Sequence, residues 1–391
     1  MQIYLDHSAT TPPCAAAIDR LTAVLQYHWG NPSSLHQWGQ RSALVLETAR
    51  QEVANLIGAA ATEVIFTAGG TEADNAAIFG LTQGYDAPQH LIISAVEHSA
   101  VSEPARWLET QGWQVTRLPV DPLGQVSPQD LAAAIQDNTV LVSVIYGQSE
   151  IGTVQPIAEL GAIARSAGIP FHTDAVQVAG RLPLDVTTLP VDLLSLSSHK
   201  LYGPQGVGAL YVRSGLRSRS GQGLEPCLEP LLRGGGQEMG LRSGTQGVAL
   251  IAGFGAAAQV AQQELVAEHQ RLVGLRDRLF QQLADLPHLK PTGHPSQRLP
   301  HHVSFCWQSP NPQNLTGKTL VHQLNRAGIG ISSGSACNSG KTVPSSVLLA
   351  LGFSPELAMG GIRLTLGRGT TIEDVDWTAM VLRQVIDRLE Q

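Results

Sequence analysis

Short apolar segments typical of strands alternate with helical segments through the middle of this 391-residue chain. Strand patterns occur at residues 63–67, 91–94, 114–118, 140–145, 170–173, 193–196 and 208–212, and helical segments such as 156–167 lie between several of them. Strands that alternate with helices form a mostly parallel sheet covered on both faces. Such a sheet binds its ligand at the carboxyl ends of its strands. The pattern therefore predicts an α/β domain with a site at that end of the sheet.

Elements of a second type follow a long helical region at about residues 248–286. They are a strand at 302–307, helices at 319–327 and 345–351, a strand at 362–366 and a C-terminal helix from about 372. Two helices also precede the alternating region. The first opens at Thr11-Pro12 and runs through Ile18, Leu21 and Leu25, and the second spans about 40–57 with one apolar face made of Leu44, Val45, Ala49, Val53 and Leu56. We expect a large α/β domain at 16–256 and a smaller α+β domain made of 1–15 and 257–391.

The composition limits the partners that this chain can have. It is 43% hydrophobic and 15% charged, which provides for a large core, and its net charge is -7 without a block of like charges. A nucleic-acid or anionic-membrane surface is therefore not expected, and small metabolites are. The N-terminus lacks a signal-peptide pattern, which predicts a cytoplasmic protein. The uncharged stretch 243–263 mixes glycine, alanine and glutamine, so it predicts a buried helix rather than a membrane span.

Lys200 follows the apolar strand predicted at 193–196 and the residues Ser-Ser-His at 197–199. It lies shortly before a turn at Gly203-Pro204. A lysine that is partly withdrawn from water has a lowered pKa and can form a Schiff base with a carbonyl cofactor. The alternative interpretation is a surface lysine before a turn. A Schiff-base lysine needs other residues nearby that bind the cofactor, and their presence distinguishes the two interpretations.

One candidate group is the turn at 67–71, Thr-Ala-Gly-Gly-Thr, which joins a strand to a helix. Backbone N–H groups at a helix N-terminus bind phosphate, although the helix dipole contributes only about 0.3–1 kcal/mol near a surface. Firm binding needs further donors, and Ser197 and His199 are candidates. The alternative is a plain helix cap at Thr71. The sequence contains neither the Walker pattern nor the Rossmann glycine fingerprint.

Asp174 directly follows the strand pattern at 170–173 and places a carboxylate at the end of that strand. Opposite a pyridinium nitrogen, such a group would keep the ring protonated and electron-withdrawing. Gln177 could reach an oxygen on the same ring, and His98 could stack over an aromatic cofactor or move protons. The alternatives are a helix cap at Asp174 and an ordinary histidine at the start of a helix.

The four cysteines lie far apart and include no C-x-x-C pair, so neither a metal site nor a disulfide framework is indicated. Cys337 lies in a loop of small residues at 332–340, whereas Cys306 lies in an apolar strand. Cys337 is therefore the predicted nucleophilic thiol. Arg363, a charge in an apolar strand, suits bidentate binding of a substrate carboxylate, with a structural salt bridge as the alternative.

Together these segments resemble pyridoxal-phosphate enzymes of the class V aminotransferase superfamily, and specifically the cysteine desulfurases of the nitrogen-fixation and iron–sulfur-cluster type. The resemblance covers nearly the whole chain. Any single segment is a weak match, but so many in the same order make chance implausible. The resemblance is carried by residues 4–12, 30–34, 68–75, 97–98, 174–177, 197–204, 234–238, 242–245 and 333–337.

The resemblance implies fold type I of pyridoxal-phosphate enzymes and the removal of sulfur from L-cysteine. Lys200 would form the Schiff base with the cofactor, His98 would stack on its ring, and Cys337 would take the sulfur as a persulfide, leaving L-alanine. The sulfur would pass to an iron–sulfur-cluster scaffold or another acceptor protein. Arg363 would bind the substrate, and Thr245 would reach the phosphate of the other subunit of a homodimer. The other cofactor contacts would come from Gly70, Thr71, Ser149, Asp174, Gln177, Ser197, Ser198 and His199.

Ser149 departs from the family's usual pattern. The family usually has Asn-Asn-Glu before Ile-Gly, and this chain has Gln148-Ser149-Glu150. Serine is shorter than asparagine and offers different donors near the ring oxygen and the substrate carboxylate, so activity, reaction specificity or substrate preference could differ. The alternatives are another pyridoxal-phosphate-dependent C–S or C–Se lyase, an aminotransferase, against which Cys337 argues, or a non-catalytic homologue that acts through a partner.

Overall fold

The computed structural model describes residues 2–216, 227–308, 316–334 and 343–390. Its larger part is built on a seven-stranded sheet with the strand order β2-β8-β7-β6-β5-β3-β4. Neighbours among β3 to β7 pair in parallel, and β8 alone runs antiparallel to its neighbours β2 and β7. The predicted mostly parallel sheet is therefore confirmed. Its strands are β2 (Val64–Thr67), β3 (His90–Ser94), β4 (Gln114–Leu118), β5 (Thr139–Ser143), β6 (Phe171–Asp174), β7 (Leu193–Ser197) and β8 (Gly208–Val212).

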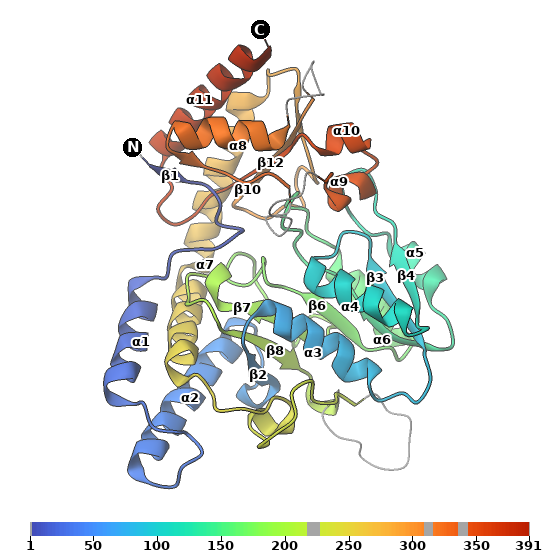
Figure 1. The fold of residues 1–391 in the computed structure, drawn as a ribbon, viewed down its shortest axis with the longest axis vertical. Coiled ribbons are helices and arrows are strands. Elements are labelled where there is room, and N and C mark those ends of the chain that lie inside the picture. The colour runs from blue at the N-terminus through green and yellow to red at the C-terminus, as the bar shows by residue number, and fades with distance from the viewer. Residues whose placement is uncertain (1, 217–226, 309–315, 335–342, 391) are drawn as a thin grey trace.

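Helices cover both faces of this sheet (Figure 1). Successive side chains of a strand point to opposite faces, and accordingly Ile92 packs in one core while Leu91 and Ile93 pack in another. Burial on both faces explains why the strands read as continuous apolar runs. The helices of this part are α1 (Ala15–Tyr27), α2 (Gln37–Leu56), α3 (Gly70–Thr82), α4 (Ser99–Thr110), α5 (Pro128–Ala134), α6 (Ile157–Ser166) and the long α7 (Val248–Leu283), with short 3-10 turns η1 (Ala61–Glu63), η2 (Ser198–Lys200), η3 (Ser214–Leu216) and η4 (Glu238–Gly240).

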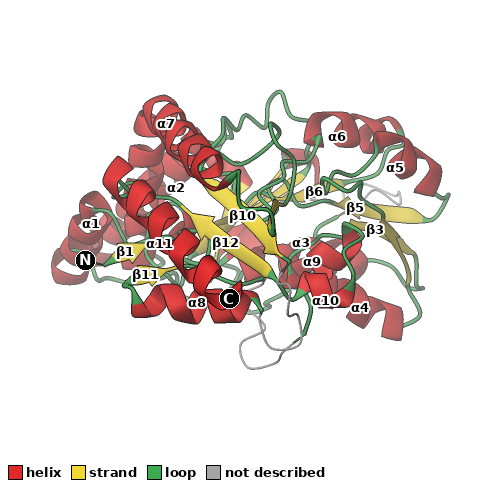
Figure 2. Ribbon diagram, turned by 90° about the horizontal axis from the view of Figure 1, so that it is seen from above, coloured by secondary structure: helices red, strands yellow, loops and turns green. Residues whose placement is uncertain are grey.

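The smaller part is built on an antiparallel sheet of three strands in the order β12-β10-β9. The N-terminal segment joins this part, because β1 pairs in parallel with β11 and Ile3 and Leu5 belong to its core (Figure 2). This packing supports the division into 16–256 and 1–15 with 257–391, whose limits stay a prediction. The elements are β1 (Ile3–Tyr4), β9 (Leu289–Pro291), β10 (His302–Trp307), β11 (Ile329–Gly330), β12 (Gly361–Thr365), α8 (Gly317–Arg326), α9 (Ser346–Ala350), α10 (Pro355–Ala358) and α11 (Ile372–Glu390).

The apolar face predicted for the second helix is confirmed at Ala49, Val53 and Leu56, which are buried, and was wrong at Leu44. The first helix begins at Ala15, later than predicted, and buries small or medium residues while Leu25 of α1 is 61% exposed and Leu44 of α2 is 71% exposed. The reason is the close approach of these helices to α7. A Cβ atom added at Gly255 of α7 would lie 2.8 Å from the Cβ atom of Ala49, so this contact requires small residues, and the longer side chain of Leu44 remains exposed.

The first part of α7 contains most of the uncharged stretch 243–263. Its side chains from Ile251 to Ala258 are buried, which confirms the prediction of a buried helix. Among the helices in the described ranges, we find none with the length and apolar character that spanning a membrane requires.

Candidate active site

A cavity of about 440 Å³ opens where the carboxyl ends of the central strands face the smaller part. Asp174 ends β6, Ser197 ends β7, and Gly70 begins the helix after β2. The smaller part closes the cavity with Arg363 of β12, and the N-terminal segment adds Ser8 and Ala9. The site therefore lies at the edge that the strand and helix pattern predicted.

Most of the predicted site residues line this cavity. They are Gly70, Thr71, His98, Ser149, Asp174, Gln177, Ser197, His199, Lys200 and Arg363. Ser198 does not line the cavity, because its side chain is buried against Gly203. Its hydroxyl has no hydrogen-bond partner within the described ranges. Thr245 lines a separate opening together with Ala68 and Arg242. Cys337 lies outside the described residues.

Lys200 lies in η2, directly after β7. Its Nζ atom donates hydrogen bonds to the carbonyl oxygens of Ser8 and Ala9, each at 2.7 Å. Its own carbonyl oxygen accepts a hydrogen bond from Nη2 of Arg181 at 2.9 Å. These contacts hold the amine at the wall of the cavity, against the N-terminal segment.

The turn before α3 lies at the place where the sequence predicts an anion site. The helix begins at Gly70 with Gly69 as the N-cap, so the alternative of a plain cap at Thr71 was wrong. A Cβ atom at Gly70 would lie 2.9 Å from Cγ2 of Val176 and 3.4 Å from the Cβ atom of Ser197, which shows why this position needs glycine. The first N–H groups of α3 and the Ser197 side chain consequently face one region.

His199 contributes a hydrogen-bonding ring rather than a charge. Its Nδ1 atom lies 3.1 Å from Oγ1 of Thr10. Burial, and then the charge of Lys200, lower the pKa of His199 to about 4. The ring is therefore uncharged at neutral pH and could donate to a phosphate only as a neutral imidazole.

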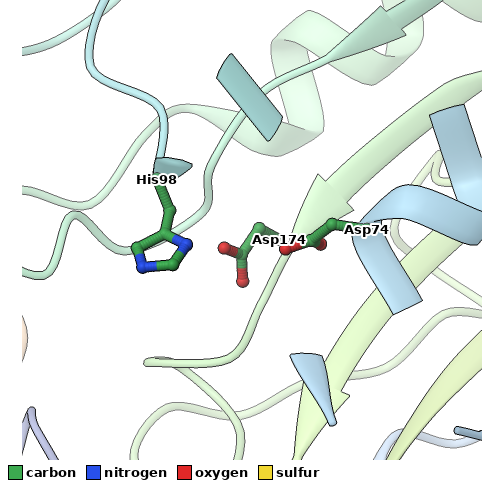
Figure 3. Close-up of side chains that lie close together, drawn as sticks. All are labelled: Asp74, His98 and Asp174. Carbon is green, nitrogen blue, oxygen red and sulfur yellow. The ribbon is translucent and has the colours of Figure 1, made fainter. Parts of the chain in front are cut away.

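Asp174 and His98 lie side by side, as Figure 3 shows. Asp174 is buried, and its Oδ1 atom accepts a hydrogen bond from the N–H of Val176 at 2.9 Å. Burial raises the pKa of this carboxyl, whereas His98 and Lys200 act to lower it. His98 caps α4, since its Nδ1 atom accepts from the N–H of Ala100 at 3.1 Å. The neutral ring therefore carries its proton on Nε2. The alternative of a histidine at the start of a helix holds for His98 alongside its place in the cavity, whereas no helix begins at Asp174 and the alternative of a helix cap there was wrong.

Gln177 and Arg181 form a buried pair beside Lys200. Nη1 of Arg181 donates to Oε1 of Gln177 at 3.1 Å, and Nε2 of Gln177 donates to the carbonyl oxygen of Ser8 at 2.9 Å. The arginine fixes which end of the amide is the acceptor. The amide NH₂ group of Gln177 is thereby turned toward the N-terminal segment.

Arg363 is 3% exposed and forms the salt bridge that was the alternative interpretation, with Nη2 lying 2.8 Å from Oδ1 of Asp6. Its Nη1 atom donates to the carbonyl oxygen of Ser149 at 3.0 Å, and Nε2 of His302 lies 3.0 Å from the same oxygen. Its Nε atom has no hydrogen-bond partner within the described ranges. The contact of Ser149 with Arg363 is thus made by the backbone, which any residue would supply.

The sequence analysis missed two buried carboxyls that line the cavity, Asp74 and Glu97, and the half-buried carboxyl of Glu150. Burial raises the pKa of Glu97 to about 8, although the Ser94 hydroxyl donates to it. Burial also raises the pKa of Glu150, which accepts a hydrogen bond from Ser345. Asp74 lies in the first turns of α3 and Glu97 lies between β3 and α4, and these positions are the signal that could have marked the two residues.

Comparisons with known proteins agree with this architecture. The model of the family "Aminotransferase class-V" matches residues 3–377. The solved structure of a NifS-like protein superposes with a TM-score of 0.89 at 32% identity and covers 100% of both chains. The structure of SspA in complex with cysteine gives a TM-score of 0.80 at 33% identity, over 94% of this chain and 99% of that one. The chain belongs to the class-V aminotransferase family.

Curated relatives narrow the comparison to one kind of enzyme. Cysteine desulfurase IscS of Methanosarcina thermophila is 43% identical over 99% of this chain and 92% of its own length. Cysteine desulfurase of Homo sapiens is 43% identical over 100% of this chain and 82% of its own length. The resemblance that the sequence motifs predicted is confirmed.

Proposed function

We propose that this protein is a pyridoxal-phosphate-dependent cysteine desulfurase. It would move sulfur from L-cysteine to Cys337, release L-alanine and pass the sulfur to an iron–sulfur cluster or another acceptor protein. The observation that carries the proposal is one cavity in which Lys200, Asp174 and the helix start at Gly70 meet, in a chain that is 43% identical to cysteine desulfurases.

The described residues fit pyridoxal phosphate. Gly70 leaves space at the start of α3 that a Cβ atom would fill, which suits a phosphate against the first N–H groups. Asp174 offers a buried carboxyl for the ring nitrogen, and Lys200 offers an amine for the carbonyl carbon. When bound, this cofactor withdraws electrons from the substrate carbons.

The residues of this chain would divide the remaining work. Lys200 would hold the cofactor, Arg363 would bind the carboxylate of cysteine, and Nε2 of His98 would hold or move a proton in the cavity. The Cys337 thiolate would form an S–S bond to the substrate sulfur as the C–S bond breaks. Thiol and cysteine then become persulfide and alanine, without an outside oxidant or reductant.

A homodimer is part of the proposal. Thr245 lines an opening separate from the Lys200 cavity, which suits a contact to the phosphate held by the other subunit. The outer faces of α1 and α2 and the segment between them expose the large apolar side chains of Leu25, Trp29, Leu35, Trp38 and Leu44. Exposed apolar side chains in such number mark an interaction surface. A cytoplasmic location and a sulfur-acceptor partner stay predictions from the sequence.

Ser149 raised the alternatives of another C–S or C–Se lyase and of a non-catalytic homologue. Its contacts to Arg363 and His302 use the backbone carbonyl, so they are the same for serine and asparagine. Incubation of the holoenzyme with L-cysteine, with assays for alanine and persulfide, tests the proposal. Pyruvate and sulfide in place of alanine and persulfide would favour the lyase, and the absence of all these products would favour the non-catalytic homologue.

Asp174→Asn should lower turnover more than it lowers stability. The change keeps the shape of the side chain and removes the charge opposite the ring nitrogen. Loss of a hydrogen bond to a charged group costs about 1.5–3 kcal/mol, which corresponds to a roughly 10- to 150-fold slower reaction. Kinetics and a melting curve on one sample decide the matter. A lower melting temperature with unchanged turnover per bound cofactor would make Asp174 purely structural.

Arg363→Lys should raise the KM for cysteine about tenfold or more, because lysine cannot make the bidentate contact to a carboxylate. Asp6→Asn is the matched control. It removes the salt-bridge partner at 2.8 Å and keeps the guanidinium, so we expect lower stability with a smaller change in KM. If both variants changed KM equally, Arg363 would act through its salt bridge alone.

A further inference from the structure

Asp74 has a buried carboxyl that takes no part in the proposed chemistry. It lies in the first turns of α3 and is 1% exposed. Figure 3 shows its carboxyl beyond that of Asp174, which lies between Asp74 and His98. One oxygen of each carboxyl and one ring nitrogen of His98 all lie within 4.8 Å of one another. Two buried carboxyl groups thus lie close together at the wall of the cavity.

The groups that contact Asp74 are hydroxyls and an uncharged ring. The Ser195 hydroxyl donates a hydrogen bond to its carboxyl, and its Oδ1 atom has no hydrogen-bond partner within the described ranges. Nε2 of His172 lies 3.6 Å from that oxygen, but the two ring nitrogens lie 2.8 Å from the hydroxyl of Ser143 and 2.9 Å from that of Ser195. Burial lowers the pKa of His172 to about 3, so this ring brings no charge to Asp74.

Asp174 has better support for a negative charge. A backbone N–H donates to it at 2.9 Å, and His98 and Lys200 act to lower its pKa against the effect of burial. Asp74 faces the opposite influences. Burial raises its pKa well above the ordinary value, and the nearby carboxyls of Asp174 and Glu97 raise it further.

We propose that Asp74 is a positioning residue held as a neutral carboxylic acid, so that Asp174 is the charged member of the pair and faces the cofactor's ring nitrogen. This role rests on the proposed function, because the ring belongs to pyridoxal phosphate. Two ionised carboxylates this close in a buried site repel, and one of them keeps its proton. The proton stays on Asp74, because His98 and Lys200 favour the charged form of Asp174, whereas the neighbours of Asp74 are carboxyls. The pair then carries one negative charge, which matches one protonated ring nitrogen.

Melting curves of the full-length chain without added cofactor test the proton on Asp74. Between the ordinary pKa of 3.8 and the raised value in the folded state, the folded chain binds a proton that the unfolded chain has released. Stability therefore falls as the pH rises through this window. Asp74→Asn has the shape of the protonated acid and cannot ionise, so it removes this loss. We expect its melting temperature to exceed the parental one by several degrees more at about pH 8 than at about pH 5.

Infrared spectroscopy gives a second readout that does not require the Asp74 variant to be stable. Glu97→Gln lacks the other buried carboxyl whose pKa is raised, to about 8, and it should still show the carbonyl band of a buried, protonated carboxylic acid near neutral pH. When Asp174→Asn is added to Glu97→Gln, the neighbouring charge is gone, so this band should disappear at a lower pH.

An equal melting difference at both pH values, or a Glu97→Gln spectrum without the band, would overturn the proposal. Both measurements use the chain without cofactor. A failure to form alanine from cysteine would therefore count against the proposed function and leave the protonation of Asp74 as measured.

Discussion

Lys200→Ala should abolish the formation of alanine from cysteine, with a loss on the order of 10⁴-fold or more. Nζ of Lys200 lies at the wall of the cavity, 2.7 Å from each of two carbonyl oxygens of the N-terminal segment, and an alanine there cannot bind the cofactor's carbonyl carbon. The side chain lines an open cavity, so its loss leaves no dry void and stability should change little. The measurements are alanine production, the visible spectrum and a melting curve.

Two further variants make this test specific. Lys200→Arg keeps the positive charge near the carbonyl oxygens of Ser8 and Ala9 but cannot bind the cofactor covalently, so it should be as inactive as Lys200→Ala. Lys290→Ala, an exposed lysine in β9, should keep the parental rate. Turnover by Lys200→Ala, or a colourless parental protein after saturation with pyridoxal phosphate, would refute the assignment.

Cys337→Ser should separate the chemistry at the cofactor from the transfer of sulfur. Addition of L-cysteine should still change the cofactor's absorption spectrum, because binding of the substrate amine needs no protein thiol. Alanine release should fall by a factor on the order of 10³ or more, since a hydroxyl cannot replace a thiolate as the acceptor of sulfur. Brief exposure of the parental protein to L-cysteine should add one sulfur atom to the Cys337 peptide, which mass spectrometry detects.

Cys306 provides the matched control within the same chain. Its thiol is buried in β10 and donates to the carbonyl oxygen of Leu357 at 2.9 Å. Burial raises the pKa of this thiol to about 12, so it carries almost no thiolate at neutral pH. Cys306→Ser should keep alanine and persulfide formation. If Cys337→Ser made alanine at the parental rate, Cys337 would not be the acceptor of the substrate sulfur, whereas pyruvate and sulfide in place of alanine would make the lyase alternative correct.

The strands of the central sheet could be predicted because each is buried on both faces. β3 (His90–Ser94) and β7 (Leu193–Ser197) lie within a residue of the predicted segments, since an apolar run is a local property of the sequence. The apolar face of α2 could be predicted only in part. Periodicity shows that a helix has an apolar face, but the choice of face at Leu44 depended on the small residues of α7 that it approaches.

The sequence by itself determined that Lys200, Asp174 and the turn at 67–71 would reach one edge of the sheet. Asp174 ends a strand, Lys200 closely follows one, and the turn begins a helix, and ligands bind at that edge of such a sheet. Only the tertiary structure decided the charges of these groups. Atoms of Asp74, His98 and Asp174 lie within 4.8 Å of one another because of the way α3 packs against the sheet. The contacts of Arg363 to Asp6 and Ser149 depend in the same way on how β12 faces the larger part. Strand and helix patterns specify local backbone, whereas burial and the distance between two charges arise from packing between segments far apart in the chain.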